Sequence, residues 1–222
     1  MSFSKEWDDI YKASAHLSVW PWSDLVSLVK RHVPSIGPGT RVLEIGCGAG
    51  ANVPFFQSLG VDYCAVEGSP SIVAQLQAQY PEIADRFVAC DFTETLHFDG
   101  PFDVAIDRGS LPHNSDAGIR KTVSLAYDAL RPGGKLISVD LCSDQHYGAT
   151  SGTPCDDTYT RKDFTEGALA GTGRVHFADK ENLLDIFADW NIETLMHKRY
   201  DPVTPDTGFV LAFWNMVAEK PA

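Results

Sequence analysis

The chain has 222 residues, of which 44% are hydrophobic and 22% charged, enough for one globular domain with a sizeable core. Its 18 basic and 30 acidic residues give a formal net charge of −12, so it lacks the basic surface of a protein that binds nucleic-acid phosphates. Its five cysteines are widely separated without a CxxC pair, and no segment approaches the roughly 20 apolar residues of a membrane span. We therefore expect a reduced, soluble, cytoplasmic protein with neither a nucleic-acid nor a membrane partner.

Strand-like and helix-like segments alternate along the first two thirds of the chain. The first is a helical pattern over residues 22–33, with apolar side chains such as Leu25, Leu28 and Val29 on one stripe. The predicted strands that follow are Arg41–Ile45, Asp62–Val66, Arg86–Cys90, Phe102–Asp107 and Lys135–Leu141, and the predicted helices among them are Pro70–Tyr80 and Asp116–Leu130. This alternation is typical of a parallel sheet with crossover helices.

The last third of the chain has a different pattern. Residues 143–176 are polar and long for a plain loop, so we expect this segment to be functional or partly helical. A predicted helix, Asp179–Trp190, precedes two predicted strands, Ile192–Tyr200 and Gly208–Glu219. Two strands joined without a helix indicate an antiparallel hairpin at the edge of the sheet.

Three glycines at every second position follow the first predicted strand. Gly46, Gly48 and Gly50 let the backbone come close to a ligand, and a helical pattern resumes directly after them. A strand, a glycine turn and a helix N-terminus together predict a site for a nucleotide-like cofactor. Glu67 follows about 20 residues later, where an acidic side chain meets ribose hydroxyls in dinucleotide sites. These features alone leave both NAD and other adenosine cofactors open.

Further motifs separate these cofactors. Glu44 with the three glycines gives the pattern Glu-x-Gly-x-Gly-x-Gly, which resembles motif I of class I S-adenosylmethionine-dependent methyltransferases. Asp91 and Phe92 after the third predicted strand, and residues 130–136 before the fifth, resemble later motifs of the family in the same order. The resemblance implies S-adenosyl-L-methionine as cofactor. It also implies an α/β, Rossmann-like fold: a seven-stranded, mostly parallel sheet with helices on both faces and an antiparallel C-terminal strand.

The resemblance also implies which residues bind the cofactor. Glu44 and the glycines should surround the methionine portion, Glu67 should bind the ribose, and Asp91 with Phe92 should meet the adenine. The full predicted cofactor set is Glu44, Gly46, Cys47, Gly48, Gly50, Glu67, Gly68, Ser69, Asp91, Phe92 and Asp107.

The segment after the fourth predicted strand, 107–114, should face the methyl acceptor. It lacks the Asn/Asp-Pro-Pro-aromatic tetrad of amino methylation and the Pro-Cys of pyrimidine methylation, which favours a small-molecule acceptor. His113 is the first candidate for a general base. Its alternative role is structural, as a side chain that only hydrogen-bonds to the backbone of the loop. Asp107 is the second predicted catalytic residue. The predicted substrate-binding residues are Trp20, Trp22, Arg108, Ser110, His146 and His176.

The resemblance further predicts how the chain is divided. Residues 1–34 should form a helical lid over a methyltransferase domain of residues 35–222, with the polar segment 142–178 near the acceptor. The blocks Ser18–Asp24 and Arg174–Phe177 resemble a bacterial subgroup that occurs among polysaccharide-building enzymes. That resemblance indicates a sugar or nucleotide-sugar hydroxyl as the acceptor.

Several alternatives stay open at this point. One is an NAD-dependent oxidoreductase, and another is a non-catalytic subunit that binds S-adenosylmethionine. A homodimer is also considered.

A metal site is a further alternative. The carboxylate oxygens of Asp107 and Asp140, with Asp156 or Asp157, could coordinate a metal ion. Aspartates at strand ends are common in this fold without a metal, so we expect a metal-free site.

Overall fold

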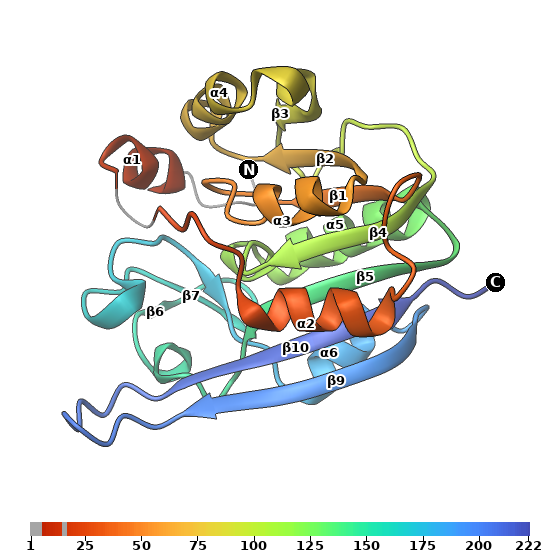
Figure 1. Cartoon of the computed structure of the whole chain (residues 1–222). Helices are drawn as coiled ribbons and strands as arrows, with labels where there is room; N and C mark the ends of the chain where they lie inside the picture. Colours follow the sequence, from red (N-terminus) through yellow and green to blue (C-terminus); the bar gives the residue numbers. More distant parts are fainter. Residues whose placement is uncertain (1–5, 15–16) are drawn as a thin grey trace.

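A seven-stranded sheet forms the centre of the computed structural model, which describes residues 6–14 and 17–222. Residues 1–5 and 15–16 of the predicted lid lie outside the described residues. The strand order is β3-β2-β1-β4-β5-β10-β9 (Figure 1). The strand bounds are β1 Arg41–Ile45, β2 Asp62–Glu67, β3 Phe87–Ala89, β4 Phe102–Arg108, β5 Leu130–Cys142, β9 Asn191–Tyr200 and β10 Leu211–Glu219. Five strands are parallel, and β10 runs antiparallel to both of its neighbours, β5 and β9. The predicted Rossmann-like fold is confirmed.

Helices cover both faces of this sheet because its strands are apolar on both sides. Residues of β1 alternate between the two faces: Val42 packs with α2, α3 and α4, whereas Leu43 and Ile45 pack with α5 and α6. The helix bounds are α1 Glu6–Lys12, α2 Ser23–His32, α3 Val53–Leu59, α4 Pro70–Gln79, α5 Asp116–Ala129 and α6 Lys180–Ile186. Two buried cores result, one on each face of the sheet. The helices that cover the two faces can be followed in Figure 1.

Local sequence signals fix where the crossover helices begin. Ser69 and Ser115 each accept a hydrogen bond from the backbone N–H three residues later, at the N-termini of α4 and α5. Asp179 caps α6 in the same way, with a distance of 2.7 Å from Asn182 N to its Oδ1. The predicted start of each helix is therefore within one residue of the observed one, but α6 ends at Ile186, four residues before the predicted Trp190.

The strand β5 begins earlier than predicted. Residues 131–134, which precede the predicted strand start at Lys135, lie inside β5 as an irregularity in its pairing with β4. Gly133 has a φ of +71°, and its N–H donates to the carbonyl of Lys220 at 2.9 Å. A Pro-Gly-Gly sequence therefore does not end the strand here, because the C-terminal segment supplies a hydrogen-bond partner.

The polar segment after β5 folds into a second, smaller sheet and two short 3-10 helices. The strands of this sheet are β6 Thr153–Pro154, β7 Thr160–Lys162 and β8 Val175–His176, in that order. The 3-10 helix η3 Tyr147–Thr150 precedes β6, and η4 Gly167–Leu169 lies between β7 and β8. The 3-10 turn η1 Pro81–Arg86 leads into β3, and η2 Leu111–His113 follows β4.

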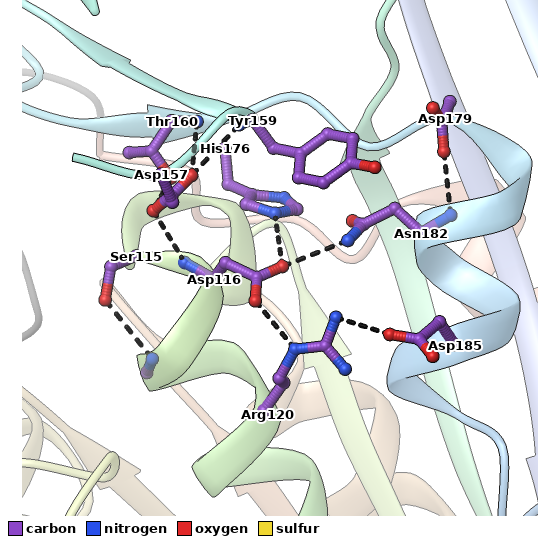
Figure 2. Close-up of polar contacts among 11 residues, drawn as sticks. Ser115, Asp116, Arg120, Asp157, Tyr159, Thr160, His176, Asp179, Asn182 and Asp185 are labelled. Atoms are coloured by element: carbon purple, nitrogen blue, oxygen red, sulfur yellow. Dashed lines mark hydrogen bonds and ion pairs between the residues drawn. The ribbon is translucent and has the colours of Figure 1, made fainter. Parts of the chain in front are cut away.

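A network of side chains ties this small sheet to α5 and α6 (Figure 2). Asp116, the first residue of α5, accepts hydrogen bonds at one oxygen from His176 Nε2 at 3.3 Å and Asn182 Nδ2 at 3.0 Å. Its other oxygen pairs with Arg120 Nε at 2.6 Å. Asp157 accepts from the backbone N–H of Asp116 at 3.2 Å and so joins the small sheet to the same helix. These contacts, led by the one from His176, hold the pKa of Asp116 well below its usual range.

Within residues 6–14 and 17–222, none of the helices combines the length and the apolar character that a membrane crossing requires.

Candidate active site

A cavity of about 520 Å³ lies at the carboxyl ends of β1, β4 and β5. Such cavities at the strand ends are where open α/β sheets bind ligands, and this volume lies in the usual range for small-molecule sites. Residues from α1 and from the start of α2 line it together with the strand ends. Its lining residues are Trp7, Asp8, Tyr11, Leu17, Ser18, Trp22, Glu44, Gly46, Cys47, Gly48, Ala49, Ala51, Glu67, Gly68, Ser69, Phe92, Arg108, Gly109, Ser110, His113, Asn114, Asp140, Cys142, His146, Ala168, Leu169, Leu211 and Phe213.

The glycine turn after β1 has both a ligand-facing and a structural part. Gly48 lines the cavity with a φ of +51°, and a Cβ atom there would lie 2.8 Å from the hydroxyl of Tyr11. Gly50 does not line the cavity: a Cβ atom there would lie 2.5 Å from Leu76 Cδ2. Gly50, predicted to bind the cofactor, thus serves the packing of the turn against α4.

Glu67, at the end of β2, holds the glycine turn through its buried carboxylate. Its Oε2 accepts from Gly48 N at 2.9 Å, and its Oε1 accepts from Ser69 N at 3.0 Å. Burial raises the pKa of Glu67, and the backbone hydrogen bonds oppose that rise. Each carboxylate oxygen has a further lone pair, so the group can also accept from ligand hydroxyls. Gly68 and Ser69 line the same end of the cavity.

Glu44, in β1, is satisfied mainly by the protein itself. Its two oxygens accept from Asn52 Nδ2 at 2.8 Å and from the Tyr63 hydroxyl at 2.6 Å. The side chain is almost fully buried, and burial raises its pKa to about 7. Its donors come from the polypeptide, so a cofactor ammonium is not needed to satisfy this carboxylate. Asn52 lies two residues after the last glycine of the turn. An amide side chain at this position is the sequence signal that could have identified Asn52 as a partner of Glu44.

The helix α1, which belongs to the N-terminal segment predicted as a lid, covers the glycine turn and the turn that follows β4. Asp8 accepts from the hydroxyls of Ser69 at 2.6 Å and Ser71 at 2.7 Å, which fixes α1 at the N-terminus of α4. Tyr11 is only 8% exposed, and burial raises its pKa. The Trp7 ring lies 5.6 Å from that of Tyr11 and 4.7 Å from that of His113, between centroids. The sequence signal for this packing is the four-residue spacing of the aromatic residues Trp7 and Tyr11, which places both on one side of a helix.

Asp107, predicted as both catalytic and cofactor-binding, does not line the cavity. It is fully buried, and its Oδ1 accepts from Ser110 N at 3.0 Å, Ser110 Oγ at 2.6 Å and Leu111 N at 3.0 Å. Burial raises its pKa to about 6. The carboxylate therefore shapes the turn between β4 and η2, and through that turn it positions His113 at the cavity.

Two histidines line the cavity, and they differ in what they can do. His113 comes from η2 and packs edge-on against Trp7. His146 accepts a hydrogen bond at Nδ1 from Gly148 N at 3.1 Å, and burial lowers its pKa to about 4. A neutral imidazole that accepts at Nδ1 carries its hydrogen on Nε2, so His146 is a hydrogen-bond donor at neutral pH and not a base.

Charged side chains from distant segments meet at the β4–β5 end of the cavity. The guanidinium carbon of Arg108 lies 3.6 Å from the centroid of the Trp22 ring. Asp140, near the end of β5, has a φ of +62°, and its Oδ1 lies 2.5 Å from Lys198 Nζ. Lys198 comes from β9 and also pairs with Asp24 of α2 at 2.7 Å. Asp140, Lys198 and Asp24 were not among the predicted binding residues, because only the three-dimensional fold brings them together.

Three further predicted residues lie outside the cavity lining. Trp20 is 76% exposed and faces solvent. His176 is buried in the network with Asp116, so the predicted substrate contact is replaced by a structural one (Figure 2). Asp91 accepts from the backbone N–H and hydroxyl of Thr93, at 3.0 and 2.6 Å, whereas its neighbour Phe92 does line the cavity. The adenine contact of Asp91 stays a prediction.

The carboxylates considered for a metal have other partners. Asp107 accepts from Ser110, Asp140 pairs with Lys198, and Asp157 accepts from Thr160. Among residues 6–14 and 17–222 no group of three or more His, Cys, Asp or Glu side chains is arranged to hold a metal ion.

Comparison with known proteins agrees with the fold and the glycine turn. A family model described as a methyltransferase domain matches residues 42–134. An O-methyltransferase resE of Aspergillus sclerotiorum is 31% identical over 117 residues, which are 50% of this chain and 44% of that protein. A demethylmenaquinone methyltransferase of Beutenbergia cavernae is 32% identical over 106 residues, 47% of this chain and 42% of that protein. The chain thus matches less than half the length of these two relatives.

Solved structures share the fold over nearly the whole chain. A 1,6-didemethyltoxoflavin-N1-methyltransferase of Burkholderia thailandensis, solved with S-adenosylhomocysteine, has a TM-score of 0.64 at 19% identity and covers 98% of this chain and 84% of its own. An S-adenosylmethionine-dependent methyltransferase of Clostridium acetobutylicum has a TM-score of 0.65 at 13% identity and covers 97% and 96%. The [4+2]-cyclase SpnF has a TM-score of 0.64 at 16% identity and covers 97% and 94%, so this fold is not confined to methyl transfer.

These matches and the motif order define a class I methyltransferase domain. Residues 42–134 match the methyltransferase-domain family, and S-adenosylmethionine is the cofactor that this match and the solved structure with S-adenosylhomocysteine support.

Proposed function

We propose that this protein transfers the methyl group of S-adenosylmethionine to an oxygen atom of a small molecule. One observation carries the proposal: a single cavity extends from Glu67 and the glycine turn to Arg108, Asp140 and His146. A cofactor end and an acceptor end therefore share one space, as an in-line displacement between two bound molecules requires.

The cofactor end fits an adenosine-type ligand. Gly48 has no side chain in the cavity, so the backbone can approach a ligand closely there. The Glu67 carboxylate has lone pairs left for ribose hydroxyls, and Phe92 offers an apolar ring for a base. When bound, S-adenosylmethionine supplies an activated methyl group on a sulfonium.

The residues of the chain would align the acceptor, exclude water and remove a proton. The helix α1, held by Asp8, covers the cavity with Trp7 and Tyr11 and so keeps water out. His113 is the proposed base for a hydroxyl acceptor. His146 is a hydrogen-bond donor at neutral pH, and the Asp107 carboxylate accepts a hydrogen bond from the backbone N–H of Leu111.

We further propose that residues 1–34 act as the lid of a domain that spans residues 35–222.

The identity of the acceptor is the finer part of the proposal. Trp22, Leu169 and Phe213 line the acceptor end, and aromatic faces of this kind pack against sugar rings as well as planar molecules. We propose a sugar or nucleotide-sugar hydroxyl, which agrees with the resemblance of residues 18–24 and 174–177. We also propose that the protein works in the cytoplasm on a diffusible acceptor, without a nucleic-acid partner, and that it forms a homodimer.

The test is release of S-adenosylhomocysteine in the presence of nucleotide sugars, phenols, carboxylic acids and amines, with and without a chelator. We expect turnover on a hydroxyl acceptor that survives the chelator. Tight cofactor binding without turnover on any class would instead favour the non-catalytic subunit. Thermal stabilisation by NAD but not by S-adenosylhomocysteine would contradict the proposal outright.

A His113→Ala variant tests the proposed base. With a hydroxyl acceptor we expect turnover to fall by about 10²–10⁴-fold, the usual contribution of a general base, while S-adenosylhomocysteine binds as before. His97→Ala, at an exposed position outside the cavity lining, is the matched control. Equal turnover in all three proteins would remove His113 from this role.

A further inference from the structure

The guanidinium of Arg108 lines the cavity, and no residue that the structure describes accepts a hydrogen bond from it. Within residues 6–14 and 17–222, it stacks on Trp22 at 3.6 Å but makes no hydrogen bond or ion pair. We propose that Arg108 and Trp22 form a subsite for an acidic group of the methyl acceptor, a carboxylate or a phosphate. This inference rests on the proposed function and names the chemical class of its substrate.

The carboxylates near Arg108 are already paired with other groups. Asp140 and Asp24 both pair with Lys198, at 2.5 and 2.7 Å. Asn215 adds to this arrangement: its Nδ2 donates to Asp24 at 3.1 Å, and its Oδ1 accepts from Asp140 N at 3.0 Å. Lys198 therefore takes the place that Arg108 would otherwise fill as the partner of these carboxylates.

The two other carboxylates whose charges act on Arg108 from this end of the sheet are also engaged. Asp107 accepts from Ser110 and from Leu111 N, and Glu44 accepts from Asn52 and Tyr63. Their charges favour the protonated guanidinium, although burial lowers its pKa. Arginine stays charged under all ordinary conditions, so this half-buried cation has no hydrogen-bond or ion-pair partner among the residues that the structure describes.

The geometry of the pair suits an oxyanion. A half-buried guanidinium loses part of its hydration, and a ligand with two oxygens can replace the lost contacts. Its planar fork of N–H groups matches carboxylate and phosphate, which bind it through two parallel hydrogen bonds. Trp22 covers one face of the guanidinium, so the N–H groups along its edge are the part left for a ligand.

The position of Arg108 favours the acceptor over the carboxylate of the cofactor. Arg108 ends β4, and its electrostatic and stacking partners include Asp140 at the end of β5 and Trp22 at the start of α2. At the cofactor end, Glu67 ends β2 and Phe92 follows β3, and both strands lie on the opposite side of β1 in the sheet order. An acceptor with an acidic group would thus lie over β4 and β5, with its methylated atom toward the glycine turn.

The experiment is a binding measurement on the complex with S-adenosylhomocysteine, which needs no turnover. Calorimetry compares two pairs of probes that differ in charge: 4-hydroxybenzoate against 4-hydroxybenzamide, and glucose 1-phosphate against methyl glucoside. The proteins are wild type, Arg108→Gln, Arg108→Lys and the control Arg31→Gln, whose side chain is exposed on α2 and donates a hydrogen bond to Ser27. Circular dichroism checks that every variant is folded.

We expect at least one acidic probe to bind wild type and Arg31→Gln about tenfold or more tightly than its neutral partner. Arg108→Gln should abolish that preference, Arg108→Lys should keep part of it, and S-adenosylhomocysteine should bind all four proteins within about twofold. Tighter binding of 4-hydroxybenzoate would identify the acidic group of the acceptor as a carboxylate, and tighter binding of glucose 1-phosphate would identify it as a phosphate. Equal binding of acidic and neutral probes to wild type would overturn the proposal.

A tenfold or greater loss of S-adenosylhomocysteine affinity in Arg108→Gln would also overturn it, because Arg108 would then serve the cofactor. Failure of the proposed function looks different: S-adenosylhomocysteine would not bind wild type at all, or would bind without supporting turnover on any acceptor class.

Discussion

The two ends of the cavity are built in different ways. At the cofactor end, Glu67 is the last residue of β2, and its side chain accepts hydrogen bonds from the backbone of Gly48 and Ser69 in the turns that follow β1 and β2. At the acceptor end, Arg108, Trp22, Asp140 and Lys198 come from four separate elements and are held by charge and stacking. The cofactor end is therefore fixed by local chain geometry, whereas the acceptor end depends on the assembled fold.

The largest expected effect tests the packing of the glycine turn. In Gly50→Val, a side chain must adopt a φ of +77° and meet Leu76 at 2.5 Å, so we expect a loss of about 3–4 kcal/mol in the free energy of unfolding. Gly39→Val, with a φ of +88° and no atom within 4 Å, carries the backbone strain alone and should lose about 1–2 kcal/mol. Urea unfolding measures both, and equal losses would show that contact with Leu76 is unimportant.

The second prediction concerns the buried carboxylate of Glu44. Burial raises its pKa from an ordinary 4.5 to about 7, so the folded state binds its proton more tightly than the unfolded chain does. Its contribution to stability is therefore fully present below pH 4.5 and is lost as the pH rises toward 7, by on the order of 3 kcal/mol. Glu44→Gln should remove this slope, which urea unfolding between pH 4.5 and 8 measures. An unchanged slope would place the titration on another group.

The third prediction concerns cofactor affinity. Glu67→Ala removes the acceptor of Gly48 N, Ser69 N and the proposed ribose hydroxyls, so S-adenosylhomocysteine should bind about 1–3 kcal/mol more weakly. Glu94→Ala, whose carboxylate is exposed and pairs with Lys121, is the control. Calorimetry with unchanged affinity would remove Glu67 from the cofactor site.

The smallest expected effect tests whether the two ends are independent. Lys198→Met leaves Asp140 and Asp24 without their shared cation, and we expect a loss of about 1 kcal/mol in stability at pH 7, because Lys198 is partly exposed. S-adenosylhomocysteine affinity should stay within about twofold, since Lys198 does not line the cavity and residues that share no contacts usually act independently. Lys30→Met, at an exposed position on α2, is the control. A tenfold loss of affinity would show that the ends are coupled.

This difference explains how much of the molecule could be predicted from its sequence. The sheet, its crossover helices and the hairpin could be predicted, because apolar runs, caps such as Ser69 and the glycine turn act over a few residues. The same holds for Glu67, whose distance from Gly46 along the chain is set by the strand–helix–strand unit.

Contacts over long distances in sequence could not be predicted in this way. Nothing near Asp140 in the sequence indicates that Lys198 will bind it, or that Arg108 will stack on Trp22. His176 looked like a ligand-binding histidine in a polar segment, but the small sheet turns it toward Asp116 (Figure 2). Asp107 looked catalytic at the end of a strand, but the turn after β4 presents three donor groups to it.

The contact between Asp8 and α4 has a consequence for which adenosine derivatives can enter. Asp8 already occupies the N-terminus of α4, where its carboxylate accepts from Ser71 N at 3.2 Å and from two hydroxyls. A helix N-terminus after the second strand is otherwise a favourable place for a phosphate. With Asp8 and Glu67 side by side near Ser69, a phosphate on the ribose would meet two negative charges. We therefore expect these two carboxylates to disfavour adenosine derivatives with a phosphorylated ribose.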